Sequence, residues 1–401
     1  MRIGIVTGEY PPMQGGVGDF THALALALAA LGHAVHVITR EASVSEGQTN
    51  VTPQLTVHPI IRHWGWDMQR PVMALARQHD LDVLNIQYQA AAYDLHPAIN
   101  FFPWRAKFSL PFISPRDRPA ITVTFHDLKV PYLFPKAGPL RDWVVTALAH
   151  HADAAIVTNH ADELALTARR VGRVARIPIG SNIAPLSPRH CPQDQYERDA
   201  WRAERGITPE HFLLGFFGFF NARKGIETLI HALARLDDAY RLLFIGGTVG
   251  SSDATNRAYA ERMSALMAQL NLTERVLYTG YVPAAEVSAA FAATDLCVLP
   301  YADGISFHHG TLMAALVHGC PIVSTRPPFT LPELVHGENV WLAPPHDPEA
   351  LAIAITTMAQ APERRQRLAR GAAELATEFT WERIAARTAA LFSTLTSTGA
   401  A

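Results

Sequence analysis

The feature that most constrains this chain is a regular alternation of short apolar runs with longer amphipathic stretches. In the first half, the apolar runs predict strands at 2–7, 34–39, 56–61, 82–87, 120–125, 154–158 and 174–178. In the second half, they predict strands at 213–218, 242–246, 275–279, 296–300, 321–325 and 339–343. Strands that alternate with helices form parallel sheets covered by helices on both faces, so the chain is expected to be α/β.

The stretches between the strands have the period of a helix. After the first strand, apolar residues recur on one stripe at Val17, Phe20, Leu24, Leu28 and Leu31, and after Gly225 they recur at Ile226, Leu229, Ile230, Leu233 and Leu236. The last stretch, 380–397, reads as a helix with Thr380 as its N-cap.

The length of the chain favours two domains. It has 401 residues, which is more than one ordinary hydrophobic core serves. The polar, proline-bearing and weakly periodic segment 180–210 interrupts the alternation and is interpreted as the linker region. We therefore expect two doubly wound domains, at 1–185 and 205–378.

Composition narrows the class of partner and the compartment. The formal net charge is −2, so nucleic-acid binding has no electrostatic support. The three cysteines, Cys191, Cys297 and Cys320, have no CxxC spacing and fit reduced thiols. The beginning of the chain lacks the pattern of a signal peptide and no window is apolar enough to span a membrane, so a soluble cytoplasmic protein is expected.

A glycine-rich loop, "GEYPPMQGGVGDF", follows the first predicted strand. Gly15 and Gly16 lack side chains, so their backbone N–H groups can approach an anion at the start of the next helix. A tight connection without a ligand is the alternative. A dinucleotide-binding loop is also weighed: Gly16-Val17-Gly18 lacks the third glycine, but Glu41 ends the second strand, which keeps an NAD(P) oxidoreductase open.

A second loop, "GFFGFFNARKGIETL", places Arg223 and Lys224 just before a helix. The amino-terminal end of a helix is already positive, so cations there call for an anion, and a diphosphate would satisfy both. Solvated surface charge is the alternative.

Two further loops carry polar groups at the ends of strands. "VTFHDLKVP" offers His126, a candidate catalytic residue, with Asp127 as a group that orients the imidazole or caps the next turn. "VLPYADGISFHHGTLMAALV" offers Asp303 and the run Ser306, Phe307, His308, His309, Gly310 and Thr311 before a short helix. The adjacent pair His308 and His309 suggests a metal site only weakly, because neighbouring side chains point apart, and no metal site is predicted.

The segment 100–119 mixes aromatic residues with Arg105, Lys107, Arg116 and Arg118. We interpret it as a loop packed on its own aromatic side chains. The alternative is an acceptor-side lid or a patch that makes weak contact with a membrane surface, peripheral to the membrane.

With these segments in order, the chain resembles the retaining GT-B glycosyltransferases of the group 1, glycogen-synthase-like, family 4 type. The resemblance covers nearly the whole chain and rests on "GEYPPMQGGVGDFTHALALALAALGHAVHVIT", "GFFNARKGIETLIHAL", "VLYTGYVPAAEVSAAFAATDLCVLPY", "LMAALVHGCPIVST" and "LPELVHGENVWLAPPHDPEAL". It implies two Rossmann-like domains facing across a cleft. The first is the acceptor side, with the helix 380–397 packed back on it, and the second binds a nucleotide-sugar donor.

The resemblance also implies roles for residues. Gly15 and Gly16 would approach the donor diphosphate, His126 the transferred sugar and Lys224 the diphosphate, with Ser306 to Thr311 lying over sugar and phosphate. The nucleotide sugar is a substrate, so no cofactor is expected. Family members are generally metal-independent, and Asp80-Leu81-Asp82 leads into a strand rather than forming a metal-binding loop.

Three positions depart from the family pattern. Phe219 stands where the family has an arginine, a charge that Arg223 is proposed to replace. Ser306 and Ala314 stand at the two family glutamate positions, and Asp303 is proposed to replace the first glutamate.

The function expected from the residues and the resemblance is transfer of a hexosyl or related sugar, with retention, to a glycan, lipid-linked or small-molecule acceptor. A non-catalytic GT-B protein that binds a sugar nucleotide or a glycan is the alternative, motivated by Ser306 and Ala314. An epimerase or phosphorylase of the same fold is a third reading.

Overall fold

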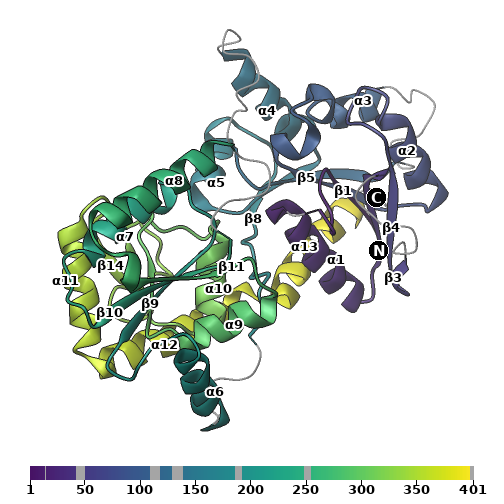
Figure 1. Ribbon diagram of the computed structural model, residues 1–401. Coiled ribbons are helices and arrows are strands. Elements are labelled where there is room, and N and C mark those ends of the chain that lie inside the picture. The colour runs from purple at the N-terminus through teal and green to yellow at the C-terminus, as the bar shows by residue number, and fades with distance from the viewer. Residues whose placement is uncertain are drawn as a thin grey trace. The chain divides into compact units, whose positions relative to one another are not determined.

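The chain folds into two compact α/β units, shown in the computed structural model of Figure 1. The first unit comprises Met1–Gly180 with Thr380–Ala401, and the second comprises Ser181–Phe379. The structure describes residues 1–13, 15–41, 50–108, 118–128, 139–185, 192–247 and 254–397. Each unit is built on its own sheet, as the alternation of strands and helices predicts.

The sheet of the first unit has eight strands among the described residues, in the order β3-β4-β2-β1-β5-β6-β7-β8. All neighbours pair in parallel except the short β3, which runs antiparallel to β4. The strands are β1 Arg2–Thr7, β2 Ala34–Arg40, β3 Asn50–Thr52, β4 Leu55–Ile61, β5 Val83–Tyr88, β6 Ala120–Phe125, β7 Ala154–Val157 and β8 Val174–Arg176.

Helices cover both faces of this sheet. They are α1 Gly16–Ala30, α2 Gln69–Gln78, α3 Phe102–Phe108, α4 Pro139–His151, α5 His160–Ala168 and α13 Trp381–Ser397. On one face, Leu24 and Leu28 of α1 and Phe392 of α13 join one buried cluster with Ile5 of β1. The last helix, yellow in Figure 1, therefore packs beside the first, purple helix although the two are far apart in the sequence.

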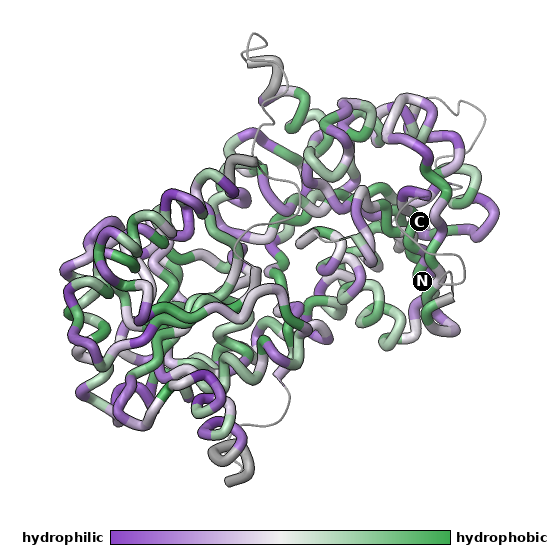
Figure 2. Tube along the Cα trace, in the orientation of Figure 1, coloured by the Kyte–Doolittle hydropathy of each residue, from purple (hydrophilic) through white to green (hydrophobic). Residues whose placement is uncertain are grey.

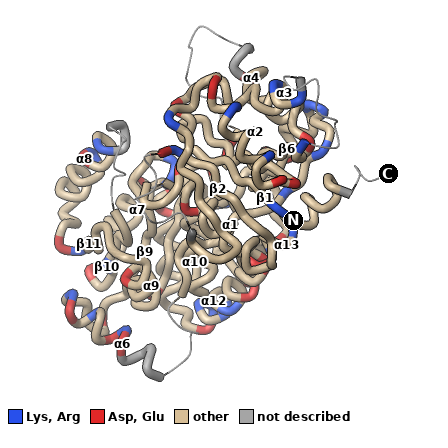
Figure 3. Tube along the Cα trace, turned by 90° about the vertical axis from the view of Figure 1, so that its right-hand side faces the viewer, with Lys and Arg blue, Asp and Glu red and all other residues tan. Residues whose placement is uncertain are grey.

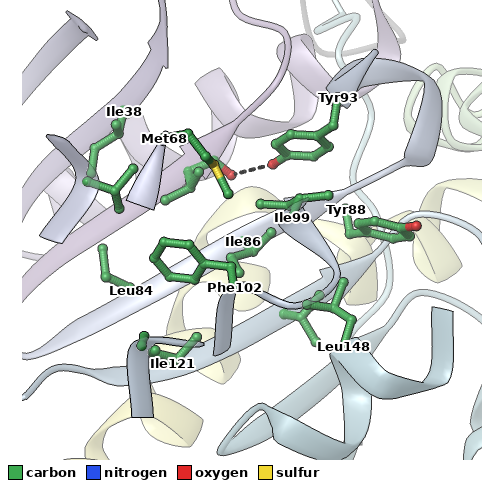
Figure 4. Close-up of a cluster of buried hydrophobic side chains, with 14 of the residues drawn as sticks. Ile38, Met68, Leu84, Ile86, Tyr88, Tyr93, Ile99, Phe102, Ile121 and Leu148 are labelled. Atoms are coloured by element: carbon green, nitrogen blue, oxygen red, sulfur yellow. Dashed lines mark hydrogen bonds between the residues drawn. The ribbon is translucent and has the colours of Figure 1, made fainter. Parts of the chain in front are cut away.

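The other face carries the larger aromatic core, drawn in Figure 4. Leu84 and Ile86 of β5 lie among Met68, Phe102 of α3 and Leu148 of α4, all of them at most 2% exposed. Burying each such side chain contributes about 1.5–3 kcal/mol. Burial is nearly continuous along β5 and β6, because these apolar side chains alternate with buried polar ones on the opposite face, Asn85, Gln87, Thr122 and Thr124.

The second unit has a six-stranded sheet among its described residues, parallel throughout, in the order β11-β10-β9-β12-β13-β14. Its strands are β9 Phe212–Phe217, β10 Tyr240–Ile245, β11 Val276–Gly280, β12 Leu296–Leu299, β13 Ile322–Thr325 and β14 Trp341–Ala343. Its helices are α6 Pro192–Ala203, α7 Ile226–Leu233, α8 Ala254–Gln269, α9 Ala284–Ala293, α10 Gly310–Val317, α11 Pro348–Ala359 and α12 Pro362–Ala376. In Figure 2 the strands of this unit are coloured mostly as hydrophobic, whereas hydrophobic and hydrophilic residues alternate along its helices.

Neighbouring residues of β9 show how both faces are covered. Phe216 joins the buried cluster that α7, α8 and α11 form on one face, and the ring of Phe217 contacts Phe291 of α9 on the other, at 5.3 Å between centroids. A strand with both faces covered by helices favours apolar residues along its whole length, as in "FLLGFF".

Every strand predicted from the sequence is present, with ends shifted by one or two residues, and β3 was not predicted. The linker interpretation of 180–210 is wrong for α6, which belongs to the second unit. Arg198 and Arg202 of α6 both pair with Asp295, at 2.6 and 3.0 Å, and these contacts tie the helix to the start of β12. The charged residues of this segment, which suggested a solvent-exposed linker, therefore attach α6 to the second unit.

The loop interpretation of 100–119 is wrong for Phe102–Phe108, which form α3. Lys107 and Arg118 both pair with Asp153, and Arg105 donates to the carbonyl of Trp66 at 2.7 Å. Arg116 lies outside the described residues. Three of the four cations are therefore held within the unit, and contact of this segment with a membrane surface stays a prediction.

None of the described helices is both long and apolar enough to cross a membrane. In Figure 3, positively and negatively charged residues both occur along α12 and along the described part of α6.

Candidate functional site

Each sheet has a point at which the chain changes the direction in which it adds strands. In the first sheet this point lies between β1 and β5, and in the second it lies between β9 and β12. Loops that leave the carboxyl ends of the strands on either side of such a point diverge, so a ligand can enter between them. Three of the loops singled out in the sequence leave at these ends, after β1, β9 and β12, whereas the loop with His126 follows β6, the neighbour of β5.

In the second unit, two loops meet at this edge of the sheet. The first follows β9 and contains the 3-10 helix Ala222–Lys224, and the second follows β12. The backbone N–H of Ala302 donates to the carbonyl of Arg223 at 2.8 Å and joins them. Gly225, at φ +67°, lies so close to the second loop that a Cβ there would be 1.7 Å from the carbonyl oxygen of Pro300. Only glycine fits this position.

Lys224 belongs to the first of these loops, and its side chain approaches the residues that follow the second. Asn221 caps the 3-10 helix by accepting from the backbone N–H of Lys224 at 3.2 Å. A Cβ added to Gly218, whose φ is +113°, would lie 2.4 Å from Nζ of Lys224 and 2.8 Å from Cγ2 of Thr311. Gly218 therefore leaves the space in which the ammonium approaches Thr311, the second residue of α10.

The electrostatics of Lys224 are those of a cation without a counter-charge. Burial lowers its pKa from 10.5 to about 8. Among the ion pairs of the described residues, none involves Lys224. The amino-terminal end of α10, which is also positive, begins one residue from Thr311. A half-buried lysine next to a helix amino terminus is stabilised by an anion, and a diphosphate supplies one.

The loop after β12 is ordered by contacts between its own side chains. The hydroxyls of Tyr301 and Thr311 are 2.6 Å apart, and the ring of His309 stacks on that of Tyr301 at 3.8 Å. Nδ1 of His308 is 2.8 Å from Oγ of Ser306. These contacts fix the start of α10 at Gly310.

Other predicted donor residues differ in accessibility. Arg223 and Asp303 are exposed, and Gly310 is exposed at the first turn of α10. Phe307 is 4% exposed and its ring contacts Phe379 at 4.8 Å, so only its backbone could reach a ligand. The roles of Asp303 and Arg223 stay predictions.

In the first unit, His126 follows β6 and ends a buried chain of polar side chains. Its Nε2 lies 2.9 Å from Oε1 of Gln87. Nε2 of Gln87 donates to Oδ1 of Asn85, and Nδ2 of Asn85 donates to the hydroxyls of Thr122 and Thr124 at 2.9 and 3.1 Å. The ring of Phe20 packs edge-on against His126, with 4.7 Å between ring centroids.

This chain sets the protonation of His126. Since the amide nitrogen of Gln87 donates to Asn85, its oxygen accepts from Nε2 of His126. Burial lowers the pKa of His126 to about 4, so the imidazole is neutral at pH 7. The proton therefore sits on Nε2, and Nδ1 carries a lone pair that can accept a hydrogen bond from a hydroxyl.

The glycine-rich loop after β1 holds a carboxylate that the sequence did not suggest. A Cβ on Gly15 would lie 2.0 Å from Oε2 of Glu9, so the Glu9 side chain packs directly on Gly15. The backbone of Gly18, in the first turn of α1, hydrogen-bonds to Glu9. Burial and the nearby Asp19 raise the pKa of Glu9, and burial raises that of Asp19. Beside Gly16 there is open space.

The structure thus groups Lys224 with Thr311, Tyr301 and the 306–310 loop, and groups His126 with Phe20 and Gln87. Asp80 and Asp82, which match a DxD motif only in their letters, both pair with Arg2. Sequence reasoning missed Gln87 and Asn85. Their signal was two polar residues within an otherwise apolar strand, "VLNIQY".

Family models match both units. Residues 15–180 match a model described as a glycosyl transferase 4-like domain, and residues 211–361 match one described as glycosyl transferases group 1. The chain belongs to the group 1 glycosyltransferases. Its two parallel α/β sheets are those of the GT-B fold.

The chain is similar to curated D-inositol 3-phosphate glycosyltransferases. A D-inositol 3-phosphate glycosyltransferase of Corynebacterium efficiens is 27% identical over 231 residues, which are 56% of this chain and 52% of that protein. One of Pseudarthrobacter chlorophenolicus is 25% identical over 415 residues, covering 96% of this chain and 94% of that protein. The chain spans about half the length of the first curated relatives that it matches.

Solved structures share the fold at low identity. A sucrose-phosphate synthase of Thermosynechococcus elongatus has a TM-score of 0.76 at 22% identity and covers 99% of this chain and 100% of its own. HepE of Anabaena, solved in complex with UDP, has a TM-score of 0.73 at 18% identity, with 98% and 100% covered.

Proposed function

We propose that this glycosyltransferase-family protein transfers a hexosyl group, with retention of anomeric configuration, from a nucleoside-diphosphate sugar to a hydroxyl group. The acceptor is a glycan, a lipid-linked or a small molecule. We assign the donor to the second unit, over 205–378, and the acceptor to the first, over 1–185 with the helix 380–397.

Lys224 is the observation that carries this proposal. Its ammonium approaches Thr311 at the start of α10 through the space that Gly218 leaves, and the described residues provide no ion-pair partner for it. Keeping a lysine in such a place costs stability in the free protein, which a bound diphosphate would offset.

The chemistry follows from the charge of the leaving group. When the bond between the anomeric carbon and the phosphate oxygen breaks, negative charge grows on the diphosphate, and Lys224 with the amides of Gly310 and Thr311 would stabilise it. The acceptor oxygen bonds to the anomeric carbon from the same face. Its proton passes to the departing phosphate oxygen, so positioned donors matter more than a protein base.

His126 is proposed to orient the transferred sugar. Its neutral ring offers Nδ1 as an acceptor for a sugar hydroxyl, while Gln87 holds Nε2–H. Gln87 is a positioning residue that acts through His126.

The first donors to test are UDP-sugars. HepE of Anabaena, which shares the fold, has been solved in complex with UDP and with UDP-glucose. The roles of Gly15 and Gly16 remain part of the proposal, with Gly16 as the position beside open space.

A non-catalytic binder of a sugar nucleotide is the second candidate, and Ala314 favours it. Ala314 is 1% exposed within α10 and has no polar side chain to hold a ribose. Losing a hydrogen bond to a buried ribose hydroxyl would cost about 1–3 kcal/mol of binding.

The test begins with a thermal-shift screen of UDP, GDP, ADP and dTDP, since a ligand that binds the native state raises its melting temperature. Donor hydrolysis and transfer are then measured with the matching nucleotide sugars. Lys224→Ala should abolish the shift and lower turnover by at least about 10²-fold. Arg235→Ala, which removes an exposed cation beyond the other end of α7, should change neither.

The outcomes separate the candidates. A shift with turnover supports the transferase, and a shift without turnover at any enzyme concentration supports the binder. No shift with any of the four diphosphates would remove the donor assignment.

A further inference from the structure

Three histidines gather in the first unit, on the face of the sheet that α2 covers. His36 is the third residue of β2, His58 is in β4, and His79 directly follows α2. The parallel pairing of β2 with β4 sets Ile38 opposite His58, so His36 and His58 are diagonal neighbours on one face. The closeness of His36 and His58 is therefore set by the register between β2 and β4.

The ring nitrogens of these residues converge. Nδ1 of His36 and Nε2 of His58 are 3.0 Å apart, and one ring nitrogen from each of the three residues lies within 4.8 Å of the others. The ring centroids of His36 and His79 are 4.3 Å apart, and those of His58 and His79 are 5.2 Å apart. Among the described residues, this is the group of three or more His, Cys, Asp or Glu that has such spacing.

We propose that His36, His58 and His79 form a binding site for a divalent transition-metal ion of the Zn²⁺ class, which clips β2, β4 and the end of α2 together.

The distances fit three imidazoles on one ion. Two nitrogens bound to Zn²⁺ at about 2.0–2.1 Å in a tetrahedron lie about 3.3 Å apart. The pair His36–His58 is already close to that separation, and His79 needs a movement of about 1.5 Å at most to complete the set. All three residues are partly exposed, so water can supply the fourth ligand.

The donor set selects the kind of ion. Imidazole nitrogen suits Zn²⁺, Cu²⁺, Ni²⁺ and Co²⁺, whereas Mg²⁺ and Ca²⁺ prefer oxygen. The nearest carboxylates in sequence, Asp80 and Asp82, are paired with Arg2. We therefore expect no response to Mg²⁺.

The site is separate from the proposed catalytic residues. His79 leads into the start of β5, and His36 lies near the start of β2, whereas His126 follows the carboxyl end of β6. The ion would therefore be structural. It would hold β4 and the short antiparallel β3 at the edge of the sheet, where strands have the fewest partners.

The experiment uses tag-free full-length protein, stripped with EDTA and dialysed. Zinc binding is measured by calorimetric titration with ZnCl₂, and bound zinc per chain by elemental mass spectrometry. We expect one zinc per chain and a raised melting temperature with ZnCl₂ but not MgCl₂. Co²⁺ in place of zinc should give the intense visible bands of a tetrahedral site.

Variants assign the binding to the cluster. His79→Asn keeps a residue suited to a helix end, and His36→Gln provides a second, independent test; each should weaken zinc affinity at least about tenfold. The matched control is His150→Asn on α4, an exposed histidine outside the cluster, which should bind zinc as the wild type does. Nucleotide binding should be unchanged in all three.

Two results would overturn the proposal. One is wild-type protein that binds no zinc, which would leave the three rings as a hydrogen-bonded stack. The other is equal zinc binding by wild type, His79→Asn and His36→Gln, which would place zinc elsewhere among the 19 histidines.

Discussion

The loop after β1 and the loop after β9 both contain glycines, but the charged side chains that pack on these glycines have opposite sign. The loop after β1 packs the carboxylate of Glu9 on Gly15, with Asp19 nearby, whereas the loop after β9 packs the ammonium of Lys224 beside Gly218. Burial raises the pKa of Glu9 and lowers that of Lys224, so it disfavours the charged form in both.

This difference in charge indicates that the two loops contribute differently to substrate binding, which the glycines alone would not show. In the loop after β1, Glu9 already accepts a backbone hydrogen bond from the first turn of α1, so an anionic ligand there would meet a carboxylate. In the loop after β9, the cation has no partner among the described residues. We therefore expect the second unit to supply most of the affinity for the diphosphate, and the first loop to contribute only through the backbone of Gly15 and Gly16.

The largest expected effect is that of Lys224→Met. Turnover should fall by about 10²–10³-fold, because a cation that stabilises the developing charge is lost. The free protein should become more stable. A folded-state pKa lowered from 10.5 to about 8 means that stability is lost as pH falls through that range, so at pH 7 the wild type bears a cost of up to about 3 kcal/mol.

Urea unfolding at pH 7 and steady-state kinetics check both parts. A variant that is less stable than wild type would contradict the view of Lys224 as an uncompensated cation, and one that keeps full turnover would break the comparison between the loops.

Gln87→Leu should have the next largest effect. It leaves Nε2 of His126 without its buried partner and Oδ1 of Asn85 with only the hydroxyl of Thr124, at a cost of about 1–3 kcal/mol of stability. The value of kcat should fall several-fold while the affinity for a nucleoside diphosphate is kept, because Gln87 acts on the sugar side through His126. Gln87→Glu, which keeps an acceptor for Nε2–H, should restore part of kcat; a change confined to diphosphate affinity would refute the positioning role.

The affinity for a nucleoside diphosphate should depend on pH above neutrality. Lys224 is protonated below its pKa of about 8 and loses its charge above it. Between pH 7 and pH 9 the competent fraction, and with it the affinity, should fall about tenfold. Titration calorimetry at both pH values measures this, and Lys224→Arg, whose charge persists, should flatten the profile. Equal slopes for the two proteins would assign the titration to another group.

The smallest effect is expected for a substitution in the loop after β1. Glu9→Gln removes the charge of the first loop while keeping its shape, and we expect the affinity for a nucleoside diphosphate to change by less than about twofold, within the scatter of surface substitutions. The KM for the acceptor is expected to move more. A tenfold gain in diphosphate affinity would show that the first loop also faces the donor phosphates.

Local patterns in the sequence were sufficient for every strand except β3, for the helices after β1 and β9, and for the place of Lys224 after β9, because the periods of strands and helices are local properties. They were insufficient for α6, whose polar sequence suggested a linker. Arg198 and Arg202 of this helix pair with Asp295, which lies nearly a hundred positions later in the chain. The same holds for Gln87, whose role depends on β6 lying beside β5.

The sequence by itself determined the family, the two parallel sheets and the loops that carry the chemistry. Only the tertiary structure decided which side chains meet: Lys224 with Thr311, Glu9 with Gly15, and His36 with His58 and His79. The physical reason is that these contacts depend on strand register and helix packing between segments far apart in the chain, and neither leaves a periodic trace in the sequence.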